Sequence, residues 1–334
     1  MDAEWVEIQG VVVDVSATEM TLLTRDGKVK ILEKNDYPLP TTTVGPVDRQ
    51  KLPGSVVRVR GVFAAFWDAA TRQLIPGRFY LGNTMLSVDE PAPGNSFAIP
   101  TKRVTDLLLF TSHAGALTRF KVTGQVLYAQ PREYFLLDGE NGFRVLTKEP
   151  LPLVEGDLVE AVGFPQLGGP SAVLLEAKAR KIGTASRPAA RPVSAPELSN
   201  ENNDATRVQV EALLLSDVVR LDQRVLELQA GSHHFLARLR TDGALPTLLR
   251  RGSRLQITGI YASTRERATD SALAGFELLL NHPADIVVLK PGPWWTTRHT
   301  MATIAVLLTG LTASLVWVAL LRRTVAQRTA RLEK

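Results

Sequence analysis

Apolar and polar residues alternate along most of this chain, in a pattern that occurs three times. The first copy begins with an alternating stretch from Trp5 to Val15, which is typical of a half-buried strand. Two apolar stretches within residues 20–32 follow, and the Asp-Gly pair between them favours a hairpin. Two more strand-like stretches lie at residues 52–66 and 73–81. The second and third copies, which begin FKVTGQVLYA and RVQVEALLLSDV, repeat this order, so each copy predicts five strands.

Small residues at equivalent places align the three copies. One lies in the first strand, one turns the second strand into the third, and one lies in the fourth strand. In that order, the sets are Gly10, Gly124 and Ala212; Gly27, Gly139 and Gly231; and Gly61, Gly163 and Gly259. Successive fourth-strand glycines are roughly 100 residues apart, the size of one small domain.

Five strands with glycine inside them predict a small closed barrel, because glycine within a strand often marks a bend at a barrel corner. The order of hairpin, connection and hairpin fits the OB-fold, a five-stranded Greek-key barrel. An immunoglobulin-type β-sandwich is the alternative, but it needs about seven strands per unit. We therefore predict a mostly β chain with three tandem five-stranded OB-like barrels, at residues 1–90, 119–183 and 207–290, followed by one transmembrane α-helix.

Two connectors separate the predicted barrels. Residues 91–118 contain a stretch, from Lys102 to Phe110, that predicts a short helix. Residues 184–206 are rich in Pro, Ala and Ser and predict a semi-extended linker, in which Arg187 and Arg191 are expected to be solvated.

The C-terminal region changes character. Residues 300–321 carry no charge over a length that a helix needs to cross a hydrocarbon core. An aromatic interface segment, 291–299, precedes this stretch and includes Trp294 and Trp295, while Arg322 and Arg323 begin a basic juxtamembrane helix at 322–334. A core helix of a soluble domain is the alternative, but such a helix would normally show a polar stripe. We predict a single membrane span.

The charges beside the span predict its orientation. Cations are concentrated after the span, and the side richer in Lys and Arg is normally cytoplasmic. We therefore expect residues 1–297 to lie outside the cytoplasm, with the chain anchored in the cytoplasmic membrane and its C-terminus inside. The first residues, MDAEWVEIQG, lack the basic and apolar regions of an export signal, so we expect the natural N-terminus to lie upstream.

The composition limits the kinds of catalytic and metal site that this chain can contain. The chain has 334 residues, 45% of them hydrophobic, which is enough to form cores. Cysteine is absent, which excludes disulfides and zinc–thiolate sites, and the net charge of +5 arises largely from the C-terminal tail and residues 178–191. No H-E-x-x-H, G-x-S-x-G, Walker A or G-x-G-x-x-G string occurs. We expect no catalysis, cofactor or metal in this chain.

Binding is the remaining class of function. OB-folds bind oligonucleotides or oligosaccharides across their second and third strands and the neighbouring loops. Aromatic residues are only 6% of the chain, few for stacking bases, and an exported domain rarely meets nucleic acid, so nucleic acid is not an expected partner. A carbohydrate or another protein is expected, with Phe66, Trp67, Tyr128 and Tyr134 as candidate contacts. The alternative is that these rings fill the barrel ends.

The span also predicts a contact between helices. Gly310 and Ser314 are four residues apart, a pair that lets two helices approach closely in lipid. Val318, Leu321, Val325 and Leu332 recur at three- and four-residue steps, with Arg328 where one more apolar residue would fall, as at the start of a two-stranded coil that continues the helix out of the membrane. We expect a homodimer through this helix, although a lone anchor is the alternative.

Taken together, the DAEWVEIQGVV entry, the PADIVVLKPGPWW exit and the Arg-rich helix after the span resemble the extracytoplasmic sensor region of bacterial membrane sensor histidine kinases. The resemblance implies a two-component signalling protein whose kinase module follows the span; no phosphoacceptor or ATP-binding motif is present in this chain. It implies that the barrels sense a ligand or partner and that the helix relays the signal. A stand-alone membrane-anchored protein that binds an oligosaccharide or an exported protein is the alternative.

Overall fold

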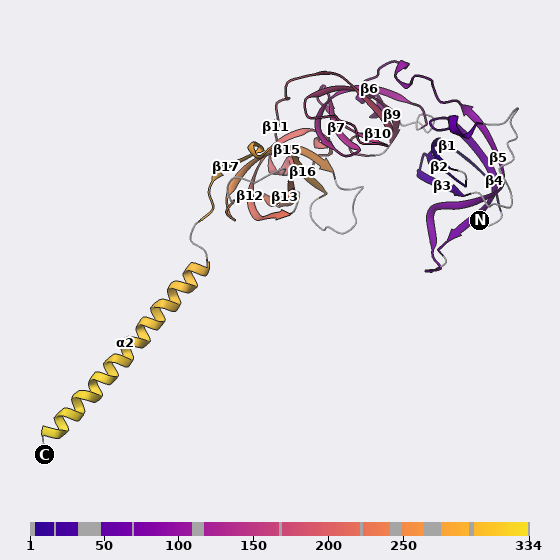
Figure 1. The fold of residues 1–334 in the computed structure, drawn as a ribbon. Coiled ribbons are helices and arrows are strands. Elements are labelled where there is room, and N and C mark those ends of the chain that lie inside the picture. The colour runs from indigo at the N-terminus through magenta and orange to yellow at the C-terminus, as the bar shows by residue number, and fades with distance from the viewer. Residues whose placement is uncertain are drawn as a thin grey trace.

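The computed structural model describes residues 4–16, 18–32, 48–68, 70–108, 117–166, 169–220, 223–240, 249–263, 275–293 and 297–332. Three barrels follow one another in an arc, and a long helix leaves the third barrel alone (Figure 1). The predicted fold class is confirmed: the chain is mostly β, with three five-stranded barrels and one C-terminal helix of membrane-spanning length.

The first barrel has the strand order β1-β2-β3-β5-β4 and closes where β4 pairs with β1. Its third and fifth strands are parallel and all its other pairings are antiparallel. This is the Greek-key arrangement expected of an OB-like barrel. The strands are β1 (Trp5–Val15), β2 (Glu19–Thr24), β3 (Gly27–Leu32), β4 (Val56–Trp67) and β5 (Leu74–Glu90).

The second and third barrels repeat this topology. The second consists of β6 (Phe120–Gln130), β7 (Glu133–Asp138), β8 (Asn141–Thr147), β9 (Asp157–Gln166) and β10 (Ala172–Thr184). The third consists of β12 (Arg207–Arg220), β13 (Gln223–Ala230), β14 (His233–Arg240), β15 (Arg254–Ser263) and β16 (Phe276–Leu280), and closes through the β12–β15 pairing. Two short strands extend its sheet: β11 (Arg191–Pro192) and β17 (Ile286–Lys290).

Alternating residues of each strand fill the barrel cores, as the period of a strand requires. Strand β13 shows this most clearly, since its even-numbered side chains from Arg224 to Ala230 are buried and its odd-numbered ones are half-buried. Each barrel has its own apolar core.

Each fourth strand carries a glycine whose missing side chain makes room for the fifth strand. A Cβ at Gly61 would lie 2.8 Å from the carbonyl oxygen of Gly82, and one at Gly163 would lie 2.8 Å from that of Leu175. The equivalent distance at Gly259 is 3.0 Å. The sequence predicted a bend at these glycines, and the structure adds the close approach of the neighbouring backbone as the reason that a side chain is excluded.

The connectors are short and packed. The predicted helix after the first barrel is α1 (Val104–Leu108), shorter than expected, and residues 109–116 lie outside the described part. The Pro-rich linker is not free, because Val193 and Leu198 are buried in the core of the third barrel. Five 3-10 turns complete the described connections: η1 (Arg49–Lys51), η2 (Ser96–Ala98), η3 (Ala195–Ser199), η4 (Glu201–Asn203) and η6 (Pro283–Asp285).

An apolar cluster joins the second barrel to the third. It contains Leu127, Tyr128 and Phe135 of the second barrel against Ile260 and Leu279, with other residues, of the third. Burial of such side chains contributes roughly 1.5–3 kcal/mol each. These two barrels are therefore joined by a continuous apolar contact.

Polar groups complete the same interface. The buried Asp204 carboxylate accepts hydrogen bonds from the Ser171 hydroxyl at 2.5 Å and from the Ser263 backbone N–H at 2.7 Å. Arg187 pairs with Glu155 at 2.7 Å and with Asp285 at 3.7 Å, and its side chain remains 37% exposed, so this cation is both paired and, as expected, in contact with solvent. A buried carboxylate satisfied from both sides fixes the relative placement of its donors.

The final helix, α2 (Thr297–Leu332), begins soon after the third barrel ends. The Gly292 N–H donates to the Ser253 hydroxyl at 2.9 Å, which holds the exit segment against the barrel. One described helix segment, His299–Arg323, is long and apolar enough to cross a membrane. Its side chains are exposed throughout, so no part of the described protein covers it.

Candidate binding surface on the first barrel

Strands β4 and β5 of the first barrel carry several aromatic rings, of which Trp67 is exposed and Phe66 and Tyr80 are half-buried. We call residues 62–67 of β4 and 74–82 of β5 the arm; within it Val62 pairs with Gly82 and Trp67 with Leu74. Beyond Val62, β4 has no β1 residue opposite it among the described pairings. The arm forms the end of the first barrel near the N-terminus (Figure 1).

The two faces of the arm differ, because side chains alternate along each strand. Phe63 and Phe79 face the barrel core, with ring centroids 5.2 Å apart. On the other face the Phe66 and Tyr80 rings lie 5.3 Å apart, and the Arg78 guanidinium carbon lies 4.3 Å from the Phe66 centroid. The outer face is thus a row of two rings and a cation in contact with one of them.

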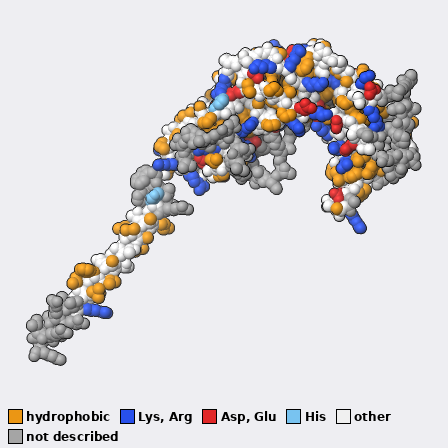
Figure 2. Space-filling model, in the orientation of Figure 1, with side chains coloured by type: hydrophobic (Ala, Val, Ile, Leu, Met, Phe, Trp, Pro, Cys, Tyr) orange, Lys and Arg blue, Asp and Glu red, His pale blue; other side chains and the backbone are white. Residues whose placement is uncertain are grey.

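Three further apolar side chains in this part of the first barrel are exposed. Trp67 is 56% exposed and its partner Leu74 is 50% exposed. Trp5, paired with Val62 across β1 and β4, is 54% exposed. Hydrophobic side chains gather on this part of the first barrel in Figure 2. Large exposed aromatic side chains in one place are typical of binding sites.

A ladder of paired charges lies beside the apolar row. The Glu7 carboxylate accepts from Arg58 at 2.6 Å and from Arg60 at 2.5 Å, and Arg58 also pairs with Asp89 at 3.2 Å. The Gln9 amide donates to Asp89 at 2.7 Å. The hydrogen bonds from Arg60 and then Arg58 hold the pKa of Glu7 below its ordinary value. This group of side chains offers both hydrogen-bond donors, from arginine and glutamine, and carboxylate acceptors beside the aromatic rings.

Of the four ring residues suggested by the sequence, only Phe66 and Trp67 lie on this surface. Tyr134 is buried in the second barrel, where its hydroxyl donates to the Leu151 carbonyl at 2.9 Å and accepts from the Leu151 N–H at 2.6 Å. Tyr128 is buried between the second and third barrels, edge-on to Phe135, and burial raises the pKa of its phenol. Neither ring can touch an external ligand from these positions, so the expectation of ligand contacts at Tyr128 and Tyr134 is corrected.

Sequence reasoning missed several members of the surface. They are Trp5 of β1 and Arg78 and Tyr80 of β5. These two strands are far apart in the sequence, and only their register against β4 places the three residues together. The alternation of apolar and polar residues over 78–82 could have indicated that Tyr80 faces outward, but not that it lies beside Phe66. Such a surface is recognised only from the pairing of the strands, which cannot be read from a single sequence.

The helix residues occupy the positions that the membrane prediction gave them, where they are described. Arg322 and Arg323 directly follow the uncharged residues 300–321, and Gly310 and Ser314 lie one turn apart along α2. Nothing lies within 4 Å of a Cβ built at Gly310. Trp294 and Trp295 lie outside the described residues.

The hydroxyls of the apolar segment are satisfied within the helix. The hydroxyl of Thr303 donates to the His299 carbonyl, and that of Thr309 to the Ala305 carbonyl, each at 2.8 Å. Hydroxyls bonded in this way are compatible with lipid because they leave no free donor. In the described part of the chain, no group of three or more His, Asp or Glu side chains could hold a metal ion.

Comparison with known proteins gives a likeness of fold alone. No protein family and no curated protein matches the chain. Among solved structures, an aspartyl-tRNA synthetase from Leishmania major Friedlin matches with a TM-score of 0.28 and 13% identity, over 34% of this chain and 24% of that one. A murine DNA-binding protein bound to double-stranded DNA matches with a TM-score of 0.28 and 11% identity, over 53% and 98%. A replication protein A heterotrimer bound to single-stranded DNA matches with a TM-score of 0.21 and 10% identity, over 92% and 97%.

These comparisons correct one expectation. The chain covers about a quarter of the synthetases that it matches, whereas it covers nearly all of the DNA-bound proteins. The expectation that nucleic acid is an unlikely partner is withdrawn, since the solved structures that this chain matches include proteins bound to double-stranded and to single-stranded DNA.

Proposed function

We propose that this chain is the ligand-binding and membrane-anchoring part of a signalling receptor. The barrels lie outside the cytoplasm, the arm of the first barrel contacts the ligand, and α2 crosses the membrane to an output module. Arg322 and Arg323 favour a cytoplasmic C-terminal end, because the positively charged side of a span is normally cytoplasmic. This chain itself is proposed to have no catalytic activity.

The observation that carries the proposal is the continuity of contacts between the barrels and the helix. The second and third barrels share an apolar cluster and the buried Asp204, and the exit segment is bonded to the third barrel through Gly292. The described exit segment ends at Pro293 and α2 begins at Thr297, so a movement of the third barrel is passed to the helix over a short stretch of chain. A helix in that position can pass on a displacement or rotation.

The test is the dependence of output on helix phase. A kinase module without its own sensor is fused after Lys334, and one to four alanines are inserted after Arg323, each of which turns the following helix by about 100°. We expect output to rise and fall with that period. A chain with six Gly and Ser residues inserted between Pro293 and Thr297 should show no periodic output, whereas the same insertion between the two strands of the arm should keep it. Output that is independent of phase in the unaltered chain would contradict the relay.

A second candidate is a stand-alone membrane-anchored protein that binds an oligosaccharide. The arm favours it, because sugar rings stack on aromatic faces and the adjoining ladder of Glu7, Arg58 and Asp89 offers paired donors and acceptors for hydroxyls. OB-folds are among the barrels that bind oligosaccharides.

The experiment titrates full-length protein in nanodiscs with oligosaccharides and, in parallel, with single-stranded and double-stranded oligonucleotides. Trp67→Ala should weaken binding at least tenfold, since exposed tryptophans dominate interface energies. Val154→Ala, which truncates another exposed apolar side chain on the second barrel, should leave it unchanged. Binding that both variants leave intact would place the contact elsewhere, and binding of oligonucleotides alone would replace the sugar as the ligand.

A further inference from the structure

The contact between the first and second barrels leaves a cavity of about 270 Å³, unlike the packed contact between the second and third. Its floor is apolar and includes Val11 of β1 and Phe164 of β9, which also form the cluster that joins these barrels. Its walls come from the turn at Gly54, the connector near Ser96, and the second barrel. The volume is close to the lower limit of about 300 Å³ for pockets that bind small molecules.

Some charges around this cavity are already paired across the two barrels. Glu176 is the extra residue of a bulge in β10, with φ of +50°, and its carboxylate lies 2.5 Å from the Lys28 amino group. Lys148 lies 3.4 Å from a carboxylate oxygen of Asp14. These two ion pairs connect the barrels. The first of them occupies the carboxylate of Glu176, the one acid among the described residues that line the cavity.

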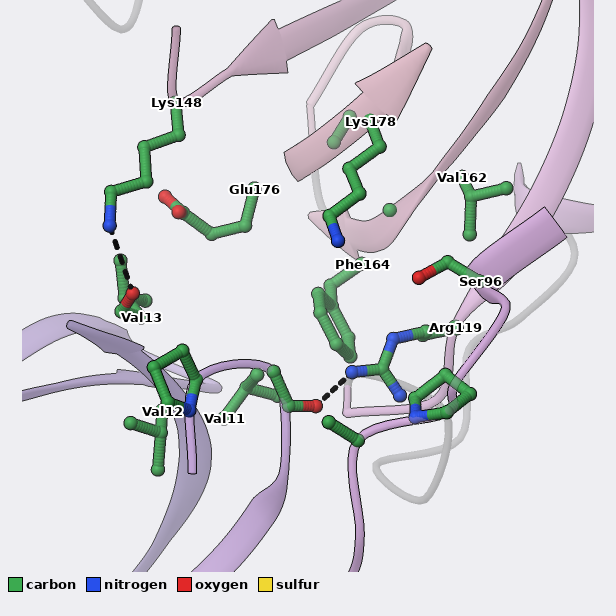
Figure 3. A pocket seen from close by; sticks show the side chains of 16 residues that line it. Val11, Val12, Val13, Ser96, Arg119, Lys148, Val162, Phe164, Glu176 and Lys178 are labelled. Atoms are coloured by element: carbon green, nitrogen blue, oxygen red, sulfur yellow. Dashed lines mark hydrogen bonds between the residues drawn. The ribbon is translucent and has the colours of Figure 1, made fainter. Parts of the chain in front are cut away.

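Two other cations of the lining are differently placed. The Arg119 guanidinium donates to the Gly54 carbonyl and lies 4.9 Å from the Phe164 ring centroid. Lys178 lies on β10, opposite Val162. Within the described residues, neither Arg119 nor Lys178 takes part in an ion pair. Figure 3 shows Arg119 and Lys178 approaching the Phe164 ring from two sides.

Burial makes the charge of Arg119 costly. It lowers the pKa of the guanidinium, and the charge of Glu90 opposes that shift only in part. A half-buried cation without a carboxylate partner is stabilised by any anion that reaches it. A guanidinium also offers two parallel N–H donors, which match a carboxylate or a phosphate. The Ser96 hydroxyl points into the same space (Figure 3).

We propose that this cavity binds a small organic anion. Its carboxylate or phosphate lies between Arg119 and Lys178, and its apolar or planar part lies against Phe164 and the β1 valines. Because Val11 and Gly54 belong to the first barrel while Lys178 and Phe164 belong to the second, the bound anion joins the two and fixes their relative orientation. This site is separate from the arm and needs none of its residues.

The experiment uses the full chain in nanodiscs and isothermal titration with citrate and with pyrophosphate, at constant ionic strength set by chloride. We expect saturable binding of at least one of the two probes. Lys178→Gln should weaken anion binding at least tenfold, because it removes the charged contact between the lysine and the anion. The Lys178 side chain is exposed and forms no ion pair within the described residues, so the substitution should leave the fold intact. Arg119→Gln should weaken binding further, and the unfolding temperature of each variant reports whether the barrels are intact.

Lys51→Gln is the matched control, since it removes an exposed cation of the first barrel that is paired with Asp48 and does not line the cavity. It should leave binding unchanged. The absence of saturable binding for both probes would overturn the proposal. So would equal weakening by Lys51→Gln and Lys178→Gln, since it would show a general response to net charge. Neither outcome would alter the phase test of the relay or the arm variants, so the two proposals fail separately.

Discussion

Substitution of valine at Gly163 is the sharpest test of the barrel architecture. Gly163 lies in β9 of the second barrel, where a Cβ would be 2.8 Å from the Leu175 carbonyl oxygen and 3.0 Å from the Ala177 Cβ. Real Cβ atoms do not approach backbone this closely, so β10 must shift at its bulge. Valine adds two methyl groups beyond that Cβ, which further crowd a position with no room for the Cβ itself.

The magnitude follows from two opposing effects. Overpacking of a fitted core costs typically about 1–3 kcal/mol. The preference of valine over glycine for strands returns up to about 1 kcal/mol. We therefore expect a net loss of about 1–2 kcal/mol, and a domain of 60–100 residues loses roughly 4–8 °C in unfolding temperature for each kcal/mol. Gly183→Val is the control, because its Cβ would lie 3.8 Å from the Leu158 side chain, an ordinary contact, and it should change stability by less than about 0.5 kcal/mol.

The assay must report on the second barrel alone. The tryptophans are at positions 5, 67, 294, 295 and 317, all outside this barrel, so tryptophan fluorescence would miss its unfolding. Hydrogen exchange followed by mass spectrometry of peptides from residues 120–184 measures it directly. Equal protection of these peptides in Gly163→Val and Gly183→Val would refute the close approach of β9 and β10.

Three further predictions concern other parts of the chain. Tyr134→Phe should destabilise the second barrel by about 1–3 kcal/mol in thermal unfolding, because it removes two hydrogen bonds to the half-buried backbone groups of Leu151. For Asp157, burial raises the carboxyl pKa, but the Lys181 ammonium and a backbone N–H outweigh it and hold the pKa below 3.8; its stabilisation is therefore complete above that pH and is lost as the pH falls through the lower folded-state value. Ile at both Gly310 and Ser314 should weaken self-association of the isolated span in a membrane dimerisation assay, because bulky side chains keep two helices apart.

Each of these predictions has its own control. An unfolding temperature of Tyr134→Phe equal to the wild type would show that the hydroxyl contributes nothing. Asp157→Asn should remove part of the loss of stability in acid, and a variant with the full acid response would contradict the role of the carboxylate. Leu311→Ile, next to the glycine, is the control for the span, and equal association of all three spans would exclude the Gly310 face as the contact.

The sequence predicted the elements because their signals are local. Gly27, Gly139 and Gly231 mark turns whose φ values of +125°, +62° and +59° suit glycine, and these turns set the register of their hairpins. The repeat of five strands then predicted the barrel, and an uncharged stretch predicted the helix. Each of these inferences needs only neighbours in the chain or the comparison of three copies.

The contacts between barrels were not predictable in the same way. Tyr128 has the sequence context of an exposed ring, but it is buried by Ile260 and Leu279, more than 130 residues away. The cavity is lined by Arg119 and Lys178, which no motif in the sequence connects. Surfaces of this kind are determined by how the domains are placed together, which the pattern within each copy does not contain.

The topology of the membrane anchor tests the central claim most directly. The chain has no cysteine, so a single introduced cysteine is the only target for a thiol reagent that cannot cross the membrane. Glu140→Cys lies in the exposed turn between β7 and β8, and Ala326→Cys follows the span. In spheroplasts of a bacterial host we predict labelling of Glu140→Cys without permeabilisation and of Ala326→Cys only after it. Labelling of Ala326→Cys in intact spheroplasts, with Glu140→Cys protected, would contradict an extracytoplasmic sensor anchored by α2.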